Sequence, residues 1–466
     1  MKVIAITLGK RLLQYIAAFT GLLQVFSCGL NLGWPSPYIP VLLSEDSPIP
    51  MTVDESSWVG TIYPLGGLCG SVLLGVVGGR IGRKSIVLWS SVPFCISRIT
   101  VAFATTLSML LIGRLIAGMS EGLALASILI YFSEISDKEI RGMLCSSVSV
   151  TLFLGVMVIN LVGSYLTIKT SSLILLVIPV INFLTFVWMP ESPNYLLMKS
   201  KYEEAKQSFI SFKGSEDADH SLTVIRTAIE KENLSQTQFI CLFKKDNRKQ
   251  LLATFGLLFA QQMSGITAFS IYAQTIFKEG GEAISPLLSA VIFHTIQLTF
   301  SVLSAALVDK LGRRPLLISS SIGSAAALFA GGLFFFIRDV VNVDTSRISV
   351  LSTIILFIYT FTFCLGLQTM PNFIPTELFP TTLKAYASTV SNVLLYSLGA
   401  ISTKYLQFTK DNYGLFVPFW SFAVCVAIGL VIIVKYLPET KNKTLEEIQI
   451  ELNQSPTTGE GSSQNP

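Results

Sequence analysis

Residues 261–268 read Gln-Gln-Met-Ser-Gly-Ile-Thr-Ala and lie inside the apolar run 250–277. The two adjacent glutamines need partners, because each side-chain amide left without a hydrogen bond in hydrocarbon costs several kcal/mol. The small residues that follow favour a bent or broken helix, and the amides and hydroxyls together offer donors and acceptors. A polyhydroxylated, uncharged ligand requires that combination. The competing interpretation is that these side chains only join helices to one another, and we favour it less for a cluster of this size.

The composition is that of a membrane protein. Of the 466 residues, 51% are hydrophobic and 13% are charged, and the mean hydropathy is +0.62, whereas a soluble domain carries about 25% charged residues. The net charge of +4 is too small to indicate nucleic-acid binding. The two histidines lie far apart, and the sequence has no metal-ligand spacing, nucleophile–base pair or phosphate-binding glycine loop. We therefore expect no metal, no cofactor and no enzymatic activity.

Twelve apolar runs divide the chain into two halves. Six lie near 12–34, 57–78, 85–107, 108–132, 143–167 and 171–189, and six near 250–277, 285–308, 315–337, 348–376, 385–408 and 416–436. Each run is long enough for a membrane-spanning helix, which needs about 20 residues. The sequence therefore predicts an all-α membrane protein of 12 transmembrane helices. We divide it into a six-helix half at 1–189, a linker at 190–249, a second six-helix half at 250–436 and a tail at 437–466.

The distribution of basic residues predicts the orientation. If the amino terminus, the linker and the tail are cytoplasmic, 25 of the 33 lysines and arginines face the cytoplasm, as the positive-inside rule requires. The loop 35–56 has four acidic residues and no lysine or arginine, which fits the outside. Within it, Thr52 and Glu55 have the spacing of a capping box, which predicts the start of the second span. We expect a multi-pass plasma-membrane protein with both termini cytoplasmic.

The linker carries a repeated apolar pattern. Apolar residues recur at alternating spacings of four and three from Met198 to Phe212, and the pattern continues from Leu222 to Ile229. This spacing is typical of amphipathic helices. We expect these helices to lie against the cytoplasmic face of the bundle.

Three short motifs occur once in each half, in the same order. Gly82-Arg83-Lys84 matches Gly312-Arg313-Arg314, the pair Glu134 and Arg141 matches the pair Glu377 and Lys384, and Pro190-Glu191-Ser192 matches Pro438-Glu439-Thr440. Such a duplication of six-helix halves is the pattern of major facilitator transporters. The charges fall at predicted cytoplasmic helix ends, where we expect arginines to pair with glutamates across the halves and so to gate the inner side. The candidate gating residues are Arg83, Arg114, Glu134, Arg141, Glu191, Arg313, Arg314, Glu377, Lys384 and Glu439.

Two arginines lie inside predicted spans. Arg114 sits at least one turn inside the fourth span, and an arginine at that depth is a functional candidate by default. We expect it to reach Glu134 or Glu191. Arg98 lies near the middle of the third span, and nothing in its sequence context assigns it a role.

The stretch 261–268 resembles helix seven of the sugar porter family of the major facilitator superfamily, whose pattern there is Gln-Gln-x-Ser-Gly-Ile-Asn-Ala. The resemblance spans nearly the whole chain. Its other matching pieces are Gly82-Arg83-Lys84, Gly113-Arg114, Tyr131 with Glu134, Arg141-Gly142, Pro190-Glu191-Ser192-Pro193, Asp309 with Gly312-Arg313-Arg314, Glu377-Leu378-Phe379-Pro380, and Pro438-Glu439-Thr440-Lys441. Residues 33–37 and 55–60 resemble the facilitated trehalose transporter branch of the family.

In this family, polar side chains from helices seven, five, eight, ten and eleven hold the hydroxyls of a sugar. The resemblance implies that the matching positions bind substrate in this chain, and these are Gln261, Gln262, Thr267, Ser149, Gln297 and Asn372. Several of them depart from the family pattern. Thr267 and Gln297 stand where the family usually has asparagine, and Asn372 stands where a tryptophan normally lies under the sugar. The resemblance therefore supports the transporter class more strongly than the identity of the sugar.

The resemblance implies a facilitative sugar transporter that works by alternating access in the lipid bilayer, with trehalose or a hexose such as glucose as its cargo. Proton-coupled members carry an aspartate in helix one, where this chain has Asn31, a neutral amide that cannot carry a proton. We therefore expect uniport. Two alternatives stay open: a proton-coupled symporter, for which Glu121 is the other deeply placed carboxylate, and a non-transporting sugar sensor on the same fold. The sequence leaves the oligomeric state open.

Overall fold

The computed structural model describes residues 2–214, 218–234, 239–243, 247–281, 284–343, 348–379 and 383–439. These residues are helical almost throughout, and no strand occurs among them. The predicted tail from residue 440 onward lies outside the described residues, as do the side chains of Glu377 and Lys384.

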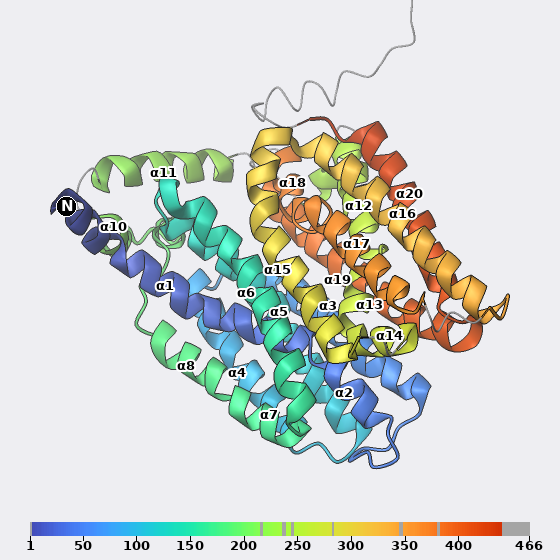
Figure 1. The fold of residues 1–466 in the computed structure, drawn as a ribbon. Helices are drawn as coiled ribbons and strands as arrows, with labels where there is room; N and C mark the ends of the chain where they lie inside the picture. Colours follow the sequence, from blue (N-terminus) through green and yellow to red (C-terminus); the bar gives the residue numbers. More distant parts are fainter. Residues whose placement is uncertain are drawn as a thin grey trace, which may run out of the picture.

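The described residues of the first half form eight helices, which make up six spans; Figure 1 shows their arrangement. They are α1 (Lys2–Leu32), α2 (Pro35–Leu42), α3 (Val53–Val77), α4 (Arg83–Ala102), α5 (Leu107–Ile135), α6 (Lys138–Tyr165), α7 (Ile168–Leu175) and α8 (Val177–Phe186). Residues 35–42, predicted as loop because of their prolines, form α2 instead, since Pro35 occupies the first helical turn, where no amide hydrogen is needed. The sixth span divides at Leu176, three residues before Pro179, which has no amide hydrogen to donate.

In the second half, the residues that the structure describes form nine helices, which make up the other six spans. They are α12 (Arg248–Gln262), α13 (Ile266–Ile271), α14 (Ala273–Gly280), α15 (Pro286–Leu311), α16 (Arg313–Asp339), α17 (Val350–Leu365), α18 (Met370–Leu378), α19 (Lys384–Tyr413) and α20 (Phe416–Tyr436). The seventh span is divided among α12, α13 and α14, and the tenth between α17 and α18.

The described parts of the linker form three helices and a short 3₁₀ turn, η1 (Phe239–Phe243). The helices are α9 (Pro193–Met198), α10 (Tyr202–Lys213) and α11 (Ala218–Leu234). Their apolar sides pack into a small core of Leu196, Leu197, Ala205, Phe209, Ala218 and Leu222. We call the end of the bundle that carries these helices the linker end, and the opposite end, where α2 and α7 lie, the far end (Figure 1).

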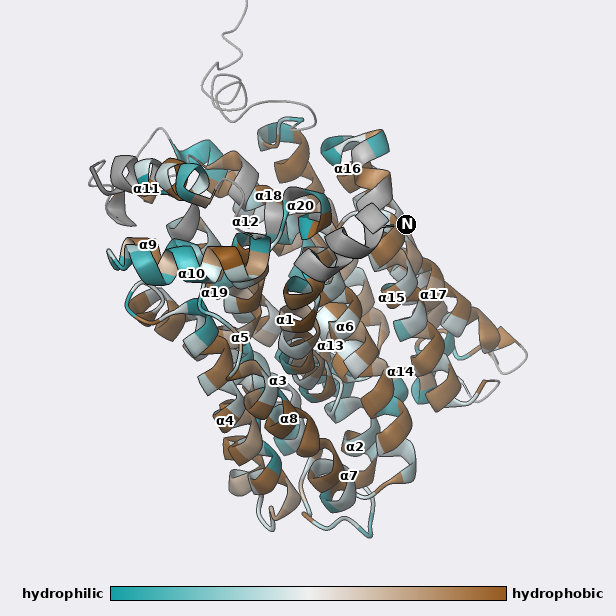
Figure 2. Cartoon of the chain, turned by 90° about the vertical axis from the view of Figure 1, so that its left-hand side faces the viewer, coloured by the Kyte–Doolittle hydropathy of each residue, from teal (hydrophilic) through white to brown (hydrophobic). Residues whose placement is uncertain are grey.

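Helix α10 is attached to the bundle rather than free of it. The side-chain amide of Gln14, on α1, donates to the carbonyl of Phe212 at 2.8 Å. The Phe212 ring also lies edge-on to Tyr131 of α5, with 6.4 Å between the ring centroids. Figure 2 shows α9 and α10 more hydrophilic in colour than the spans below them. The amphipathic helices predicted in the linker are therefore present, and α10 packs on the linker end.

Ten helical segments in the described part of the chain are long and apolar enough to cross a membrane. The shorter α17 and the more polar α19, which has 30 residues, complete twelve spans. Figure 2 shows hydrophobic colour along the outward-facing lengths of α4 and α8. The predicted all-α architecture of two six-helix halves is confirmed.

Two local features of the first half follow directly from the sequence. Helix α3 begins at the predicted capping box: the Glu55 amide donates to the Thr52 hydroxyl at 3.3 Å, and the Thr52 amide donates to the Glu55 carboxylate at 2.8 Å. Helices α3 and α5 then approach closely, since a Cβ on Gly66 would lie 3.0 Å from the Cα of Gly118. Small residues of this kind let the backbones of membrane helices pack against each other.

Candidate functional site

The seventh span breaks directly after the two glutamines. Helix α12 ends at Gln262 and α13 begins at Ile266, with Gly265 between them at φ +82°. A residue with a Cβ is strained at that φ, and a Cβ there would also overlap the ring of Phe422. The break predicted from the small residues of this stretch is confirmed, and it requires glycine.

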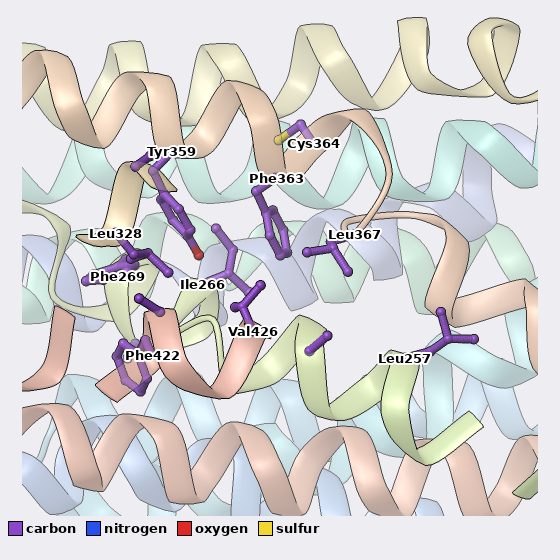
Figure 3. Close-up of a cluster of buried hydrophobic side chains, with 14 of the residues drawn as sticks. Leu257, Ile266, Phe269, Leu328, Tyr359, Phe363, Cys364, Leu367, Phe422 and Val426 are labelled. Atoms are coloured by element: carbon purple, nitrogen blue, oxygen red, sulfur yellow. The ribbon is translucent and has the colours of Figure 1, made fainter. Parts of the chain in front are cut away.

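Hydroxyl groups satisfy the backbone that this break exposes. The Ser264 hydroxyl donates to the carbonyl of Gln261 at 2.6 Å, and the Tyr359 hydroxyl donates to the carbonyl of Ser264 at 3.0 Å. Tyr359 lies in a cluster of buried apolar side chains, which Figure 3 shows. They include Ile266, Phe269, Phe363, Phe422 and Val426. The break is therefore a packed, water-poor part of the second half, where polar groups need partners inside the protein.

The tenth span breaks in a similar way. Helix α17 ends at Leu365 and α18 begins at Met370. In the break, a Cβ on Gly366 would come 2.8 Å from the carbonyl oxygen of Leu316, on α16. Glycine thus allows α16 to lie close to the break. Gln368 lies in the same break and is buried.

Gln368 joins the two breaks. Its backbone carbonyl accepts a hydrogen bond from the side-chain amide of Gln261 at 2.9 Å and another from Asn372 at 3.4 Å. Its own side-chain amide donates to the carbonyl of Gln297 at 3.3 Å and to the hydroxyl of Ser301. Three predicted substrate residues, from three spans, therefore meet around a glutamine that the sequence analysis missed. The available signal was the same as at 261–265: a glutamine near a glycine inside an apolar run.

The side-chain amide of Gln262 has a donor group that is only weakly bonded. Its Oε1 accepts from the hydroxyl of Thr267 at 2.7 Å, whereas its Nε2 has only a 3.5 Å contact with Oε1 of Gln261. That distance is too long for a strong hydrogen bond. Gly399, on α19, lies opposite, where a Cβ would stand 3.3 Å from Oε1 of Gln262. The Gln262 amide is thus placed between the seventh and eleventh spans with a donor available to a ligand.

His294 and Gln297 form a second polar pair, on α15. Nδ1 of His294 lies 2.8 Å from Oε1 of Gln297, and both side chains are fully buried. The Nε2 atoms of both residues lack a hydrogen-bond partner. Buried polar atoms normally have one, from the protein, from water or from a ligand. The sequence analysis weighed His294 only as a metal ligand and so missed this pairing.

Five of the six predicted substrate residues are linked by these hydrogen bonds. Ser149, the sixth, is half-buried on α6. Among the described residues, no hydrogen bond ties Ser149 to the other five. The seventh, eighth and tenth spans therefore supply the connected polar cluster, all from the second half.

The two halves are joined at the far end by polar contacts. Lys404, on α19, forms an ion pair with Asp54, on α3, with 3.0 Å between Nζ and Oδ1. Gln274, on α14, donates from Nε2 to Asn160 at 3.2 Å and to Ser164 at 3.1 Å, both on α6. These contacts hold the second half against the first, α19 against α3 and α14 against α6.

At the linker end, a glutamate caps a helix in each half. Oε1 of Glu191 accepts from the backbone amide of Lys84 at 2.9 Å, at the start of α4. The two oxygens of Glu439 accept from the backbone amides of Arg313 and Arg314 at 3.0 and 2.9 Å, at the start of α16. A carboxylate is favourable at a helix amino terminus because of the exposed amides and the helix dipole. The repeated Gly-Arg and Pro-Glu motifs thus form the same cap twice.

The glycine of each motif makes room for its carboxylate. A Cβ on Gly82 would overlap the Glu191 carboxylate, and a Cβ on Gly312, which is at φ +92°, would lie 3.0 Å from Oε2 of Glu439. In each half, the Gly-Arg motif and the Pro-Glu motif are far apart in the sequence. The fold brings them into contact, because the end of the sixth span lies at the start of α4 and the end of the twelfth span lies at the start of α16.

The described ion pairs of the predicted gating residues lie within one half. Arg83 is 3.6 Å from Glu134, and Glu134 also accepts from the Ser192 hydroxyl. Arg141 donates to the carbonyl of Ser136 at 3.4 Å. Pairing across the halves is not seen among the carboxylate contacts described for Glu134, Glu191 and Glu439. The sequence analysis expected pairs across the halves, whereas Arg83 and Glu134 form a pair within the first half.

Arg114 does not lie where the sequence analysis expected. Helix α5 runs from the far end to the linker end, so Arg114 lies two turns from the far end and about 30 Å along the helix from Glu134. Its Nη1 donates to the carbonyl of Asn31 at 2.6 Å. Its guanidinium lies 5.3 Å from the ring centroid of Trp34 and 4.7 Å from that of Tyr63. The expectation that Arg114 reaches Glu134 or Glu191 was wrong, because the direction of the fourth span separates them.

Two further buried groups lie near Arg114. Glu121 follows it by seven residues on α5, is 5% exposed, and has an Oε2 without a hydrogen-bond partner. Arg98 lies one turn from the far end of α4, not near the middle of its span, because α4 ends at Ala102. The side-chain amide of Asn31 donates to the carbonyl of Ser27 at 2.8 Å, within its own helix.

Comparisons with known proteins agree with this architecture. Residues 13–452 match the family described as "Sugar (and other) transporter". The chain is 30% identical to the facilitated trehalose transporter Tret1 of Apis mellifera ligustica over 448 residues, covering 94% of this chain and 88% of the relative. It is 29% identical to the protein of the same name from Bombyx mori, covering 95% and 89%. The relative of that name from Drosophila willistoni is longer, and the chain spans 50% of it at 28% identity.

Solved structures of a xylose transporter share the fold. The inward open conformation of XylE from E. coli superposes with a TM-score of 0.75 at 21% identity, covering 94% of this chain and 98% of that one. The proton:xylose symporter XylE bound to 6-bromo-6-deoxy-D-glucose gives a TM-score of 0.74 at 20% identity, with coverages of 95% and 98%. At this level of identity the likeness shows the fold alone.

Proposed function

The chain belongs to the sugar transporter family of the major facilitator superfamily, and from that premise we propose that it carries an uncharged sugar across the plasma membrane by facilitated diffusion. The cargo we propose is trehalose, as in the names of the relatives, or a hexose such as glucose. The observation that carries the proposal is the hydrogen bond between the breaks of the seventh and tenth spans, from Gln261 to Gln368. It gathers side-chain amides from several spans at one point.

The chemistry of this cluster suits a sugar. Each sugar hydroxyl both donates and accepts, and amides supply both functions without charge. Gln262 and Gln297 each have an Nε2 that is weakly bonded or unpartnered, so both can donate to hydroxyl oxygens. We propose that they bind substrate together with Gln261, Thr267, Asn372 and Ser149. A Cβ at position 399 would stand 3.3 Å from Oε1 of Gln262, so glycine there keeps a side chain of α19 away from this amide.

We propose that the two halves rock around this cluster, as in alternating access. The contacts of Lys404 and Gln274 join the halves at the far end, whereas the Glu134 ion pair at the linker end lies within one half. This arrangement is the one expected when the far side is closed and the linker side is free to open. We assign the linker end and both termini to the cytoplasm, in keeping with the positive-inside rule.

We propose uniport rather than proton coupling. On α1, the backbone carbonyl of Asn31 accepts from Arg114, and the Asn31 side-chain amide donates within its own helix and does not titrate. One observation favours the alternative of proton symport: Glu121 is a buried carboxylate with an unpartnered oxygen. An ionisable group at that depth is a functional candidate by default. The two functions make opposite predictions for sugar-driven proton movement.

The test is uptake of labelled trehalose, glucose and fructose into proteoliposomes that contain the purified protein. We expect saturable uptake of at least one sugar that stops when inside and outside concentrations are equal. Binding of a sugar without any uptake would instead indicate the sensor alternative. If the protein neither bound nor took up any of the three sugars, that result would contradict a sugar cargo.

A further inference from the structure

Arg98 is a buried cation without an acceptor. Its side chain, on α4, is 2% exposed, and no described residue accepts a hydrogen bond from it. Its Nη2 is enclosed and unpartnered. A guanidinium carries five donor hydrogens and stays charged in proteins. Burying such a group without partners is strongly unfavourable, so acceptors of some kind must occupy the space beside it.

Arg114 repeats this situation in the same part of the protein. It is 1% exposed, and its Nη2 also lacks a partner, although Nη1 and Nε donate to the carbonyls of Asn31 and Val59. The two arginines lie on helices that pack together at this level, since a Cβ on Gly113, next to Arg114, would come 2.9 Å from Val101, three residues after Arg98. The Trp34 ring, which packs on the Arg114 guanidinium, has an enclosed indole Nε1 without a partner.

Three unpartnered nitrogens around the two arginines are donors: Nη2 of Arg98, Nη2 of Arg114 and Nε1 of Trp34. Two guanidinium nitrogens and an indole nitrogen can only donate, and their neighbours Tyr38 and Tyr63 already donate to Ser171 and to the carbonyl of Cys28. Each of these three nitrogens therefore needs a hydrogen-bond acceptor. Aromatic faces of Trp34 and Tyr63 stabilise the Arg114 cation in part, but they offer nothing to the Nη2 hydrogens.

The charges of the cluster do not balance. Arg98 and Arg114 contribute two positive charges, and Glu121, seven residues after Arg114 on α5, is a buried carboxylate. Among the described residues, no hydrogen bond or ion pair joins Glu121 to either guanidinium, and its Oε2 has no partner. Even when Glu121 is ionised, one positive charge remains. One monovalent anion would make the cluster neutral and supply the missing acceptor.

We propose that a small monovalent anion, of which chloride is the probe, binds between Arg98 and Arg114 beside Trp34 in the far-end part of the first half. The site is separate from the glutamine cluster of the second half, and it does not depend on which sugar is carried. The alternative source of acceptors is ordered water, which is neutral and leaves the charge unbalanced.

The test is the thermal unfolding of the purified full-length protein in detergent, with chloride replacing gluconate at constant ionic strength. A ligand that binds only the folded state raises the Tm in a saturable way, and we expect this for the wild type. Arg98→Gln should lose the chloride-dependent shift. The control is Lys169→Gln, which removes an exposed positive charge at the far end and should keep the shift.

A second variant guards against misfolding of the first. Trp34→Phe keeps an aromatic ring over Arg114 and removes only the indole N–H, so the chloride concentration at half-maximal shift should rise about 2- to 10-fold, as expected for one lost hydrogen bond. A wild-type Tm that is indifferent to chloride would overturn the proposal and leave water as the acceptor. An equal chloride response in the wild type and both variants would overturn it too, because the anion would then bind elsewhere.

Discussion

The side-chain amide of Gln261 donates to the backbone carbonyl of Gln368 across 2.9 Å, and this bond ties the break of the seventh span to that of the tenth. Both residues are buried. The bond therefore uses one glutamine for structure, whereas its neighbour Gln262 keeps an Nε2 with only a 3.5 Å contact. Adjacent glutamines in the sequence thus have different environments, and substitutions should separate them.

Gln262→Ala should weaken sugar binding with little effect on folding. One lost neutral hydrogen bond corresponds to about 0.5–1.5 kcal/mol, or about a 2- to 10-fold rise in Kd. Isothermal titration of purified protein with the transported sugar measures this. Gln407→Ala is the matched control, since that buried glutamine bonds to Asp411 near the far end of α19. Unchanged affinity in Gln262→Ala would remove Gln262 from the site.

Gly265→Ala should destabilise the protein. A non-glycine residue in a left-handed conformation costs about 1–3 kcal/mol, and the added methyl group would also meet the Phe422 ring. The Tm in detergent should fall relative to the wild type. Gly142→Ala is the control, because a Cβ there meets nothing within 4 Å. If both variants melted at the same temperature, the broken helix would not depend on Gly265.

Lys404→Gln should favour opening of the far end. It removes the ion pair to Asp54, which joins the two halves at 3.0 Å. Lys410→Gln is the control, because Lys410 pairs with Glu279 inside the second half at 2.8 Å. The measurement is the labelling rate of a single cysteine introduced at Ser36, beside Gln274, in a background without exposed thiols. Faster labelling is expected with Lys404→Gln alone, and equal rates in the two variants would argue against this contact as part of a gate.

Glu121→Gln should leave facilitated uptake intact if transport is uniport. Adding sugar to weakly buffered proteoliposomes should then cause no alkalinisation outside, in the wild type or in the variant. The physical reason is that Asn31 does not titrate and Glu121 would not take part in the cycle. The opposite outcome is specific: alkalinisation by the wild type that disappears in Glu121→Gln would make Glu121 a proton carrier and the protein a symporter.

The sequence by itself determined the spans, their grouping into halves and the break at 261–268. These features depend on local properties. The length of each apolar run matches the thickness of a bilayer, and glycine adopts a positive φ at which a residue with a Cβ is strained. The capping box of Thr52 and Glu55 is local in the same sense, since its two bonds join residues three apart. Such patterns can be read without knowing the neighbours of a helix.

Only the tertiary structure decided which polar groups meet. Gln368 lies 107 residues from Gln261, and no periodicity in the sequence relates them. The partners of Arg114 were mispredicted because burial and helix direction, rather than the presence of acidic residues, decide which groups it reaches. The sequence could not assign a role to Arg98 for the same reason. Whether a buried charge has a partner depends on the side chains around it, and these come from different helices that pack together.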